Sequence, residues 1–124
     1  MGRALAGPFP EKPIKMIVPY PAGGGANQWA RIVAGKAEKL LGQPIMMDYK
    51  PGASTTIGAD AAAKSPADGY TVHLINSTAF AYVPNMRKVS YDPLKAFTPL
   101  VYGGGLPFVC WWPTPLCLFA ICKT

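Results

Sequence analysis

Short apolar runs and longer amphipathic segments alternate along the chain. Residues 13–20 are nearly all apolar apart from Lys15, as is typical of a strand buried on both faces of a parallel sheet. From Asn27, apolar residues recur at helical spacing for about four turns, and Gly42 stands where a C-terminal cap is expected. This first pattern predicts a strand followed by a helix. The apolar face of that helix is predicted to consist of Trp29, Ile32, Val33, Ala37, Leu40 and Leu41.

The same unit then repeats. Residues 45–47 predict a second strand, and a polar turn over residues 48–56 leads into an alanine-rich helix over residues 57–63. β-branched and aromatic residues at 70–75 predict a third strand. The order β-α-β-α-β indicates an α/β fold, an open sheet of the parallel type with flanking helices.

Weaker signals follow the third strand. Residues 79–86 predict a short helix, and Asp92 followed by Pro93 predicts a capped turn. Residues 98–102 predict a fourth strand. From Val109 the sequence changes to a tail without a charge before its last two residues and without a helical or strand period, so we expect this tail to differ from the body of the fold.

Composition limits the classes of function. A chain of 124 residues with 50% hydrophobic and 15% charged residues is expected to form one globular domain. The net charge of +6 suits an acidic ligand, but the basic residues are scattered and are not interleaved with aromatic residues, so we expect no nucleic-acid partner. The three cysteines, Cys110, Cys117 and Cys122, match no zinc spacing, and no metal site is expected.

No arrangement of residues supports catalysis. The sequence lacks a Ser/His/Asp pattern, a G-x-S-x-G motif and paired carboxylates in the predicted loops. The single histidine, His73, lies inside a predicted strand, where a packed or edge-exposed imidazole is expected rather than a ligand or a base. No catalytic residue is therefore assigned.

The chemistry is expected in a glycine-rich turn between the first strand and the first helix. Gly23, Gly24 and Gly25 leave backbone N–H groups open at a helix N-terminus, which attracts anions. The turn lacks the Lys-Ser/Thr of a P-loop and the spacing of G-x-G-x-x-G, although Asp48 keeps a dinucleotide fold as an alternative. The remaining interpretation is a loop that holds a small carboxylate by its backbone.

Two further polar turns are expected beside the glycine turn. One contains Ser54, Thr55 and Thr56, which can cap the second helix, contact a ligand, or do both. The other follows the third strand at Asn76. Because parallel strands present their carboxyl ends at one edge of a sheet, we expect all three turns to converge there.

Four motifs in order give the chain a family resemblance. The segments IKMIVPYPAGGGAN, AEKLLGQPI, KPGASTTIGADAAAKSPADGYTV and YDPLKAFTPL closely resemble the Bug family of periplasmic solute-binding proteins, the receptors of tripartite tricarboxylate transporters. The resemblance covers about residues 9–108. It implies two α/β lobes that close around a small carboxylate, such as an amino acid, a dicarboxylate, a tricarboxylate or an aromatic acid, and deliver it to membrane permease subunits. It implies a periplasmic protein with no cofactor and no catalytic activity.

The resemblance also implies which residues bind the ligand. The turns that match residues 20–27 and 51–56 grip a carboxylate through backbone groups and water. This chain has Asn27 where the family usually has aspartate, although asparagine can still cap the helix, and Ser54 and Thr55 where it tends to have glycines. The predicted ligand-binding residues are Tyr20, Pro21, Ala22, Gly23, Gly24, Gly25, Asn27, Gly52, Ala53, Ser54, Thr55, Thr56, Asn76, Ser77 and Thr78.

The resemblance suggests three segments. Residues 1–8 are interpreted as a leader remnant or vector-derived residues, without a complete signal peptide, and residues 9–109 as a partial first lobe of a type II periplasmic-binding-protein fold. Residues 110–124 are interpreted as a frameshifted end, because GTG CTG GTG G read one base late encodes Cys-Trp-Trp, as at Cys110. The expected product is a truncated receptor with impaired binding. The alternatives are a phosphate- or nucleotide-binding α/β domain of an enzyme and a degenerate fragment without function.

Overall fold

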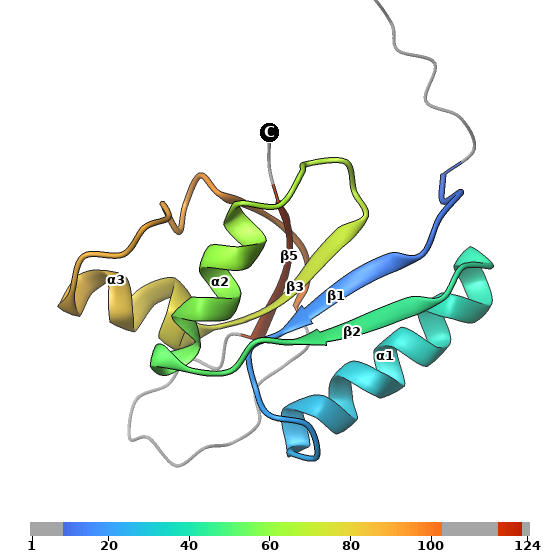
Figure 1. Ribbon diagram of the computed structural model, residues 1–124, viewed down its shortest axis with the longest axis horizontal. Helices are drawn as coiled ribbons and strands as arrows, with labels where there is room; N and C mark the ends of the chain where they lie inside the picture. Colours follow the sequence, from blue (N-terminus) through green and yellow to red (C-terminus); the bar gives the residue numbers. More distant parts are fainter. Residues whose placement is uncertain (1–8, 103–116, 123–124) are drawn as a thin grey trace, which may run out of the picture.

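The computed structural model describes residues 9–102 and 117–122, and it forms one five-stranded sheet with helices on both faces (Figure 1). The strand order is β2-β1-β3-β5-β4. The strands are β1 (Ile14–Val18), β2 (Ile45–Tyr49), β3 (Thr71–Asn76), β4 (Phe97–Tyr102) and β5 (Cys117–Cys122). The helical elements are α1 (Gly25–Leu41), η1 (Ala53–Thr55), α2 (Thr56–Ala63), the π-type turn η2 (Thr78–Tyr82) and α3 (Val83–Met86).

The β-α-β-α-β order predicted from the sequence is confirmed. Strand β1 pairs in parallel with β2 on one side and with β3 on the other. Its residues Ile14, Met16, Ile17 and Val18 are buried, while Lys15 is exposed. A central parallel strand with helices on both faces accounts for this apolar run.

Helix α1 packs on one face of the sheet through part of the predicted face, which includes Trp29 and Val33, and through two small residues outside it. Ala30 and Ala34 are the buried apolar residues of the helix, and they lie against Met16, Val18 and Leu74. Ile32 and Leu40 are 63% and 87% exposed, so their prediction as core residues was wrong. Small alanine side chains let the helix backbone approach the sheet closely, and Trp29 and Val33 pack beside them, partly buried.

Helix α2 and the segment after β3 cover the opposite face. Ala59, Ala62 and Ala79 pack there against Ile17 and Ile75. His73 is fully buried on this face, so of the packed and edge-exposed roles expected for it the packed one is correct. The short helix predicted over residues 79–86 is present as η2 and α3, and Asp92 accepts hydrogen bonds from the backbone N–H groups of Leu94 and Lys95, as predicted for a capped turn.

The far half of the sheet differs from the parallel sheet that was expected. Strand β5 lies between β3 and β4 and is antiparallel to both. The tail was predicted to have no strand pattern, and this was wrong for Cys117–Cys122. An interior strand of a sheet reads as a continuous apolar run without a period of two, as Leu-Phe-Ala-Ile does here. The leader at 1–8 and the start of the tail at 110–116, with Cys110, lie outside the described residues.

Candidate functional site

Three loops meet at the edge of the sheet formed by the carboxyl ends of β1, β2 and β3 (Figure 1). The first loop is residues 19–24, the second loop is residues 50–55, and the third begins at Asn76 and continues into η2. Residues 21–25 and 52–54 are exposed, whereas Tyr20, Thr55 and Asn76 are half-buried beneath them. The predicted convergence of the three turns is present in the structure.

Asn76 joins the three loops through its side-chain amide. Its Oδ1 atom accepts hydrogen bonds from the Thr55 hydroxyl and from the Ala79 backbone N–H, each at 3.0 Å. Its Nδ2 atom donates to the hydroxyl of Tyr20. One side chain therefore fixes the first loop, the second loop and the start of η2 relative to one another. Ser77 and Thr78 lie at that start, where the Thr78 carbonyl accepts a bond from the Val83 N–H.

The first loop presents bare backbone at the start of α1. Gly23 has φ of 99°, a conformation that favours glycine, and Gly24 is the N-cap and makes no side-chain capping bond. No acidic residue lies in the first turn of this 17-residue helix. The positive end of the helix dipole is therefore not neutralised by a helix side chain, which favours an anion in front of it.

Asn27 does not cap the helix. It lies inside the first turn, its backbone N–H donates to the Gly24 carbonyl at 3.0 Å, and its side chain is buried. The Oδ1 atom accepts a hydrogen bond from the Tyr49 hydroxyl at 2.5 Å. Asn27 thus ties the start of α1 to the end of β2, a role that the helix-cap prediction missed.

The second loop is built from an unusual backbone. Ala53, Ser54 and Thr55 have φ values of 45°, 55° and 70°, three consecutive residues in the left-handed region. Such a conformation costs about 1–2 kcal/mol for each residue that has a Cβ atom. Side-chain capping of α2 is absent at Thr55, whose hydroxyl instead bonds the Ser54 carbonyl and Asn76. Thr56 bonds the Ala53 carbonyl at 2.7 Å.

Two residues outside the predicted set also shape this loop. A Cβ atom on Gly58 would lie 2.9 Å from Cβ of Pro19, so only glycine lets α2 sit on the end of β1. Arg87, at the end of α3, donates from Nη2 to the Ala53 carbonyl at 2.9 Å. Neither contact has a local sequence signal, because both join segments that are far apart in the chain.

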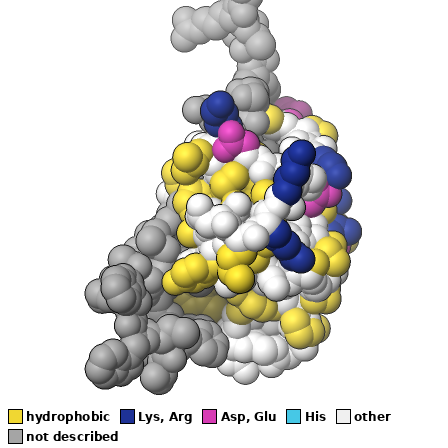
Figure 2. Space-filling view, turned by 90° about the vertical axis from the view of Figure 1, so that its left-hand side faces the viewer, with side chains coloured by type: hydrophobic (Ala, Val, Ile, Leu, Met, Phe, Trp, Pro, Cys, Tyr) yellow, Lys and Arg dark blue, Asp and Glu magenta, His cyan; other side chains and the backbone are white. Residues whose placement is uncertain are grey.

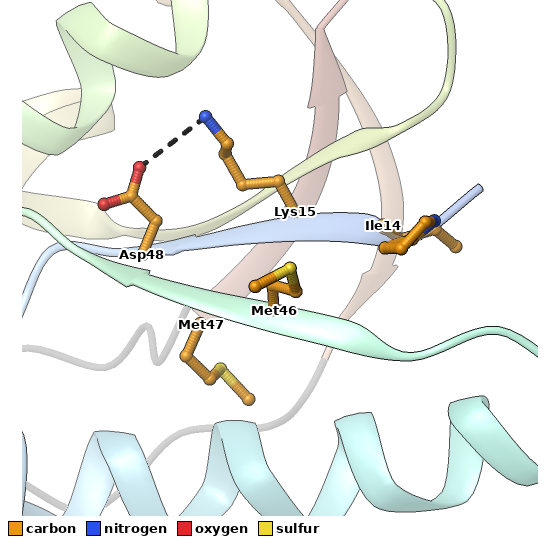
Figure 3. A pocket seen from close by; sticks show the side chains of 6 residues that line it. Ile14, Lys15, Met46, Met47 and Asp48 are labelled. Carbon is orange, nitrogen blue, oxygen red and sulfur yellow. Dashed lines mark ion pairs between the residues drawn. The ribbon is translucent and has the colours of Figure 1, made fainter.

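A separate hollow lies over the start of β1 and the middle of β2, and none of the predicted ligand-binding residues lines it (Figure 3). Its lining includes Lys15, Met46 and Asp48. The Asp48 carboxylate lies 3.8 Å from the Lys15 ammonium and 3.5 Å from that of Lys50. Asp48 is thus engaged by two lysines on the sheet, which does not favour the dinucleotide alternative in which it would bind a ribose.

The convergent loops offer hydrogen-bond donors to an anion, and Tyr20 carries the one ionisable side chain among the predicted ligand-binding residues. Within residues 9–102, none of the predicted ligand-binding residues is a carboxylic acid, a histidine or a cysteine. The described part of the chain also holds no group of three side chains able to bind a metal ion, and no helix in it is long and apolar enough to cross a membrane. The arrangement offers backbone N–H groups and hydroxyls, which are donors suited to a carboxylate.

Comparison with known proteins connects this geometry with a family. Residues 29–116 match the family model described as the tripartite tricarboxylate transporter family receptor, TctC. Protein BugT of Bordetella pertussis is 41% identical to the chain over 103 residues, which are 82% of this chain and 32% of BugT.

Solved structures agree with the sequence match. The periplasmic binding protein BugD superposes with a TM-score of 0.69 at 35% identity, over 73% of this chain and 30% of BugD. MatC of Rhodopseudomonas palustris, solved with bound malate, superposes with a TM-score of 0.70 at 33% identity, over 76% of this chain and 32% of MatC. The chain thus spans about a third of the length of the relatives that it matches.

Proposed function

Because this chain belongs to the tripartite tricarboxylate transporter receptor family, we propose that its three loops bind one carboxylate group of a small organic acid. The family consists of substrate-binding receptors, and the solved relatives include periplasmic binding proteins. The resemblance found in the sequence is thereby confirmed at the level of the family. The ligand of this chain and its permease partner are proposed.

The junction at Asn76 is the observation that carries the proposal. It holds the exposed backbone of the first and second loops at fixed positions, next to the N-terminus of α1. A carboxylate that accepts several backbone N–H bonds gains about 1.5–3 kcal/mol from each, because hydrogen bonds to charged groups are stronger than neutral ones. A preformed set of backbone donors therefore favours a carboxylate group.

The proposed substrate class follows from the position of the first and second loops. Both loops lie at one edge of the sheet and face one ligand end, so we propose a ligand with at least one free carboxylate. Malate is the first candidate, because the related MatC was solved with bound malate. Amino acids, tricarboxylates and aromatic acids belong to the same proposed class.

The role in transport is proposed for the protein in its family context. We infer a periplasmic receptor that hands its ligand to membrane permease subunits and that needs neither a cofactor nor a catalytic step. Since the chain spans about a third of the length of its relatives, we expect its own affinity to be weak. A two-lobed receptor buries its ligand between lobes, and one set of loops supplies only part of those contacts.

Nitrogen-15 NMR titration of the 124-residue chain tests the proposal, because this method detects weak binding. L-Malate is expected to shift the backbone amides of residues 22–26 and 52–56 in a saturable manner, whereas ATP and NAD are expected to leave them in place. Saturable shifts with ATP but not with malate would support the phosphate-binding alternative instead. No response of the loop amides to malate, citrate, glutamate or benzoate would refute the proposal.

Asn76→Asp is the informative variant for the same titration. An aspartate keeps the acceptor oxygens that bind Thr55 and Ala79, so the fold is expected to survive. It also places a negative charge beneath the loops, and we expect at least a tenfold rise in the dissociation constant for malate. Asn85→Asp adds the same charge on the exposed side of α3 and is expected to change this constant less than twofold. Equal effects of the two variants would contradict a carboxylate site at the loops.

A further inference from the structure

The second loop is held from outside the site by a basic residue. Arg87 Nη2 donates to the Ala53 carbonyl at 2.9 Å, across 34 positions of sequence. The Thr56 hydroxyl donates to the same oxygen at 2.7 Å. The Thr56 backbone N–H donates to this oxygen as well. The Ala53 carbonyl is therefore directed by three donors, two from Thr56 at the start of α2 and one from Arg87.

This carbonyl determines where the next amide points. The only cis peptide bond among the described residues is Phe9–Pro10, so the peptide between Ala53 and Ser54 is trans. In a trans peptide the C=O and N–H groups point in opposite directions. When the Ala53 carbonyl faces Arg87, the Ser54 N–H therefore faces away from α3.

The conformation at this point needs an external support. Ala53, Ser54 and Thr55 all have positive φ without being glycine, a combination that persists only where surrounding contacts hold it. Thr55 is held by Asn76, but Ala53 and Ser54 are exposed. The bond from Arg87 is a contact that fixes the exposed half of the turn.

Arg87 itself is well placed to act as a support. Its backbone N–H bonds the Val83 carbonyl at 2.9 Å, at the end of α3. The chain that follows is anchored by the Ser90 hydroxyl on Asp60 of α2 and by the Tyr91 hydroxyl on the Ala79 carbonyl at 2.6 Å. The guanidinium thus extends from a fixed backbone, although its side chain is exposed. Figure 2 shows the side of the molecule on which α3 lies, where Lys and Arg side chains appear beside apolar ones.

We propose that Arg87 is a positioning residue for carboxylate binding: its bond to the Ala53 carbonyl holds the left-handed turn so that the Ser54 N–H is available to the ligand. This inference rests on the proposed function of the loops. Arg87 does not touch the ligand, and its contribution is the orientation of one peptide group.

The ligand-free NMR spectrum tests the first half of the inference. Arg87→Met removes the donor from an exposed site, so the protein is expected to fold, while the amide signals of Ser54 and Thr55 shift. The hydrogen exchange of the Thr55 amide, which donates to the Gly52 carbonyl, is expected to quicken at least fivefold. Arg87→Lys keeps a donor and is expected to restore part of the wild-type signal positions. Lys88→Met is the matched control, because it removes the same charge from the neighbouring exposed residue, for which we expect unchanged loop amides. Loop amides that stay in place in Arg87→Met would overturn the inference.

Malate titration of the same variants tests the second half. We expect Arg87→Met to raise the dissociation constant for malate roughly fivefold, Arg87→Lys to raise it less, and Lys88→Met to leave it within twofold. Equal weakening by Arg87→Met and Lys88→Met would show a general charge effect and overturn the positioning role. Failure of the wild-type chain to bind malate or any other carboxylate would refute the proposed function. The ligand-free spectra test separately whether the bond from Arg87 fixes the loop.

Discussion

His73 is the only histidine of the chain, and it is fully buried in β3. Its Nδ1–H group donates to the Ile17 carbonyl at 3.2 Å, and its Nε2 atom has no hydrogen-bond partner among the described residues. Burial disfavours the charged ring and lowers the pKa of His73 to about 4, from an ordinary value of 6.5. The imidazole is therefore neutral in the folded protein at neutral pH.

The pKa of His73 makes the stability of the fold depend on pH. In the unfolded chain the imidazole takes up a proton below pH 6.5, whereas in the folded protein it does so only near pH 4. The stability that the fold owes to a neutral His73 is complete above pH 6.5 and is lost as the pH falls toward 4. Urea unfolding should show a loss of about 2–3 kcal/mol between pH 7.5 and pH 4.5 from this group.

His73→Leu should remove this pH dependence while keeping an apolar side chain in the core. The free energy of unfolding of the variant is then expected to change little between pH 7.5 and pH 5, where carboxylates remain ionised. The same slope in the variant and in the wild type would assign the effect to other groups.

At the scale of residues, the sequence indicates the residue types of the turns but not the contacts that these residues make. The glycine and hydroxyl content of the turns indicated anion-binding loops, because those properties are local. The junction at Asn76 and the bond from Arg87 to Ala53 join residues 21 to 56 positions apart, and no local pattern encodes such pairs. Asn27 was assigned to a helix cap by its residue type, but the burial of its side chain against Tyr49 decides its role.

Helices α1 and α2 approach the sheet through small residues. Besides Asn27, the buried positions are Ala30 and Ala34 of α1 and Gly58, Ala59 and Ala62 of α2. Hydrophobic periodicity predicted that these helices exist and roughly where they begin and end. It placed Trp29 and Val33 correctly against the core but missed Ala30 and Ala34 and wrongly included Ile32 and Leu40. The periodic pattern counts a large apolar residue as core, whereas the closest packing here requires a small one.

Gly58→Ala tests the close approach of α2 to β1. The new Cβ atom would lie 2.9 Å from Cβ of Pro19 and 3.3 Å from the Lys50 carbonyl oxygen, both part of the framework of the loops. We expect a loss of about 1–2 kcal/mol in the free energy of unfolding, because overpacking outweighs the better helix propensity of alanine. Urea denaturation measures this change.

Gly35→Ala in α1 is the matched control, because no atom lies within 4 Å of its added Cβ atom. It should stabilise the protein by roughly 0.5–1 kcal/mol, the usual gain when alanine replaces glycine inside a helix. A stabilising Gly58→Ala variant would mean that α2 is free to move away from Pro19 without cost.

The whole molecule combines a part that the sequence predicts well with a part that it does not. The β-α-β-α-β half was predictable because each strand and helix has its own periodic pattern and short connections. The position of β5 between β3 and β4 was not, because an interior strand has no alternation and its partners are distant in sequence. The interpretation of residues 110–124 as a frameshifted end remains a hypothesis that sequencing of the locus tests, and downstream DNA without the rest of a receptor in the other frame would refute it.

The place of β5 leads to a prediction for the stability of the whole sheet. Ala120 pairs with His73 of β3 and with Pro99 of β4, so its backbone lies between two partners. Ala120→Pro removes an N–H group from an interior strand and should destabilise the protein by roughly 3 kcal/mol, whichever neighbour that group faces. Ala120→Val keeps the N–H group and suits a strand, so it should have a much smaller effect. Thermal unfolding of the two variants measures the contribution of β5 to the folded sheet. Equal melting temperatures for Ala120→Pro and the wild type would show that β5 contributes nothing to the stability of the fold.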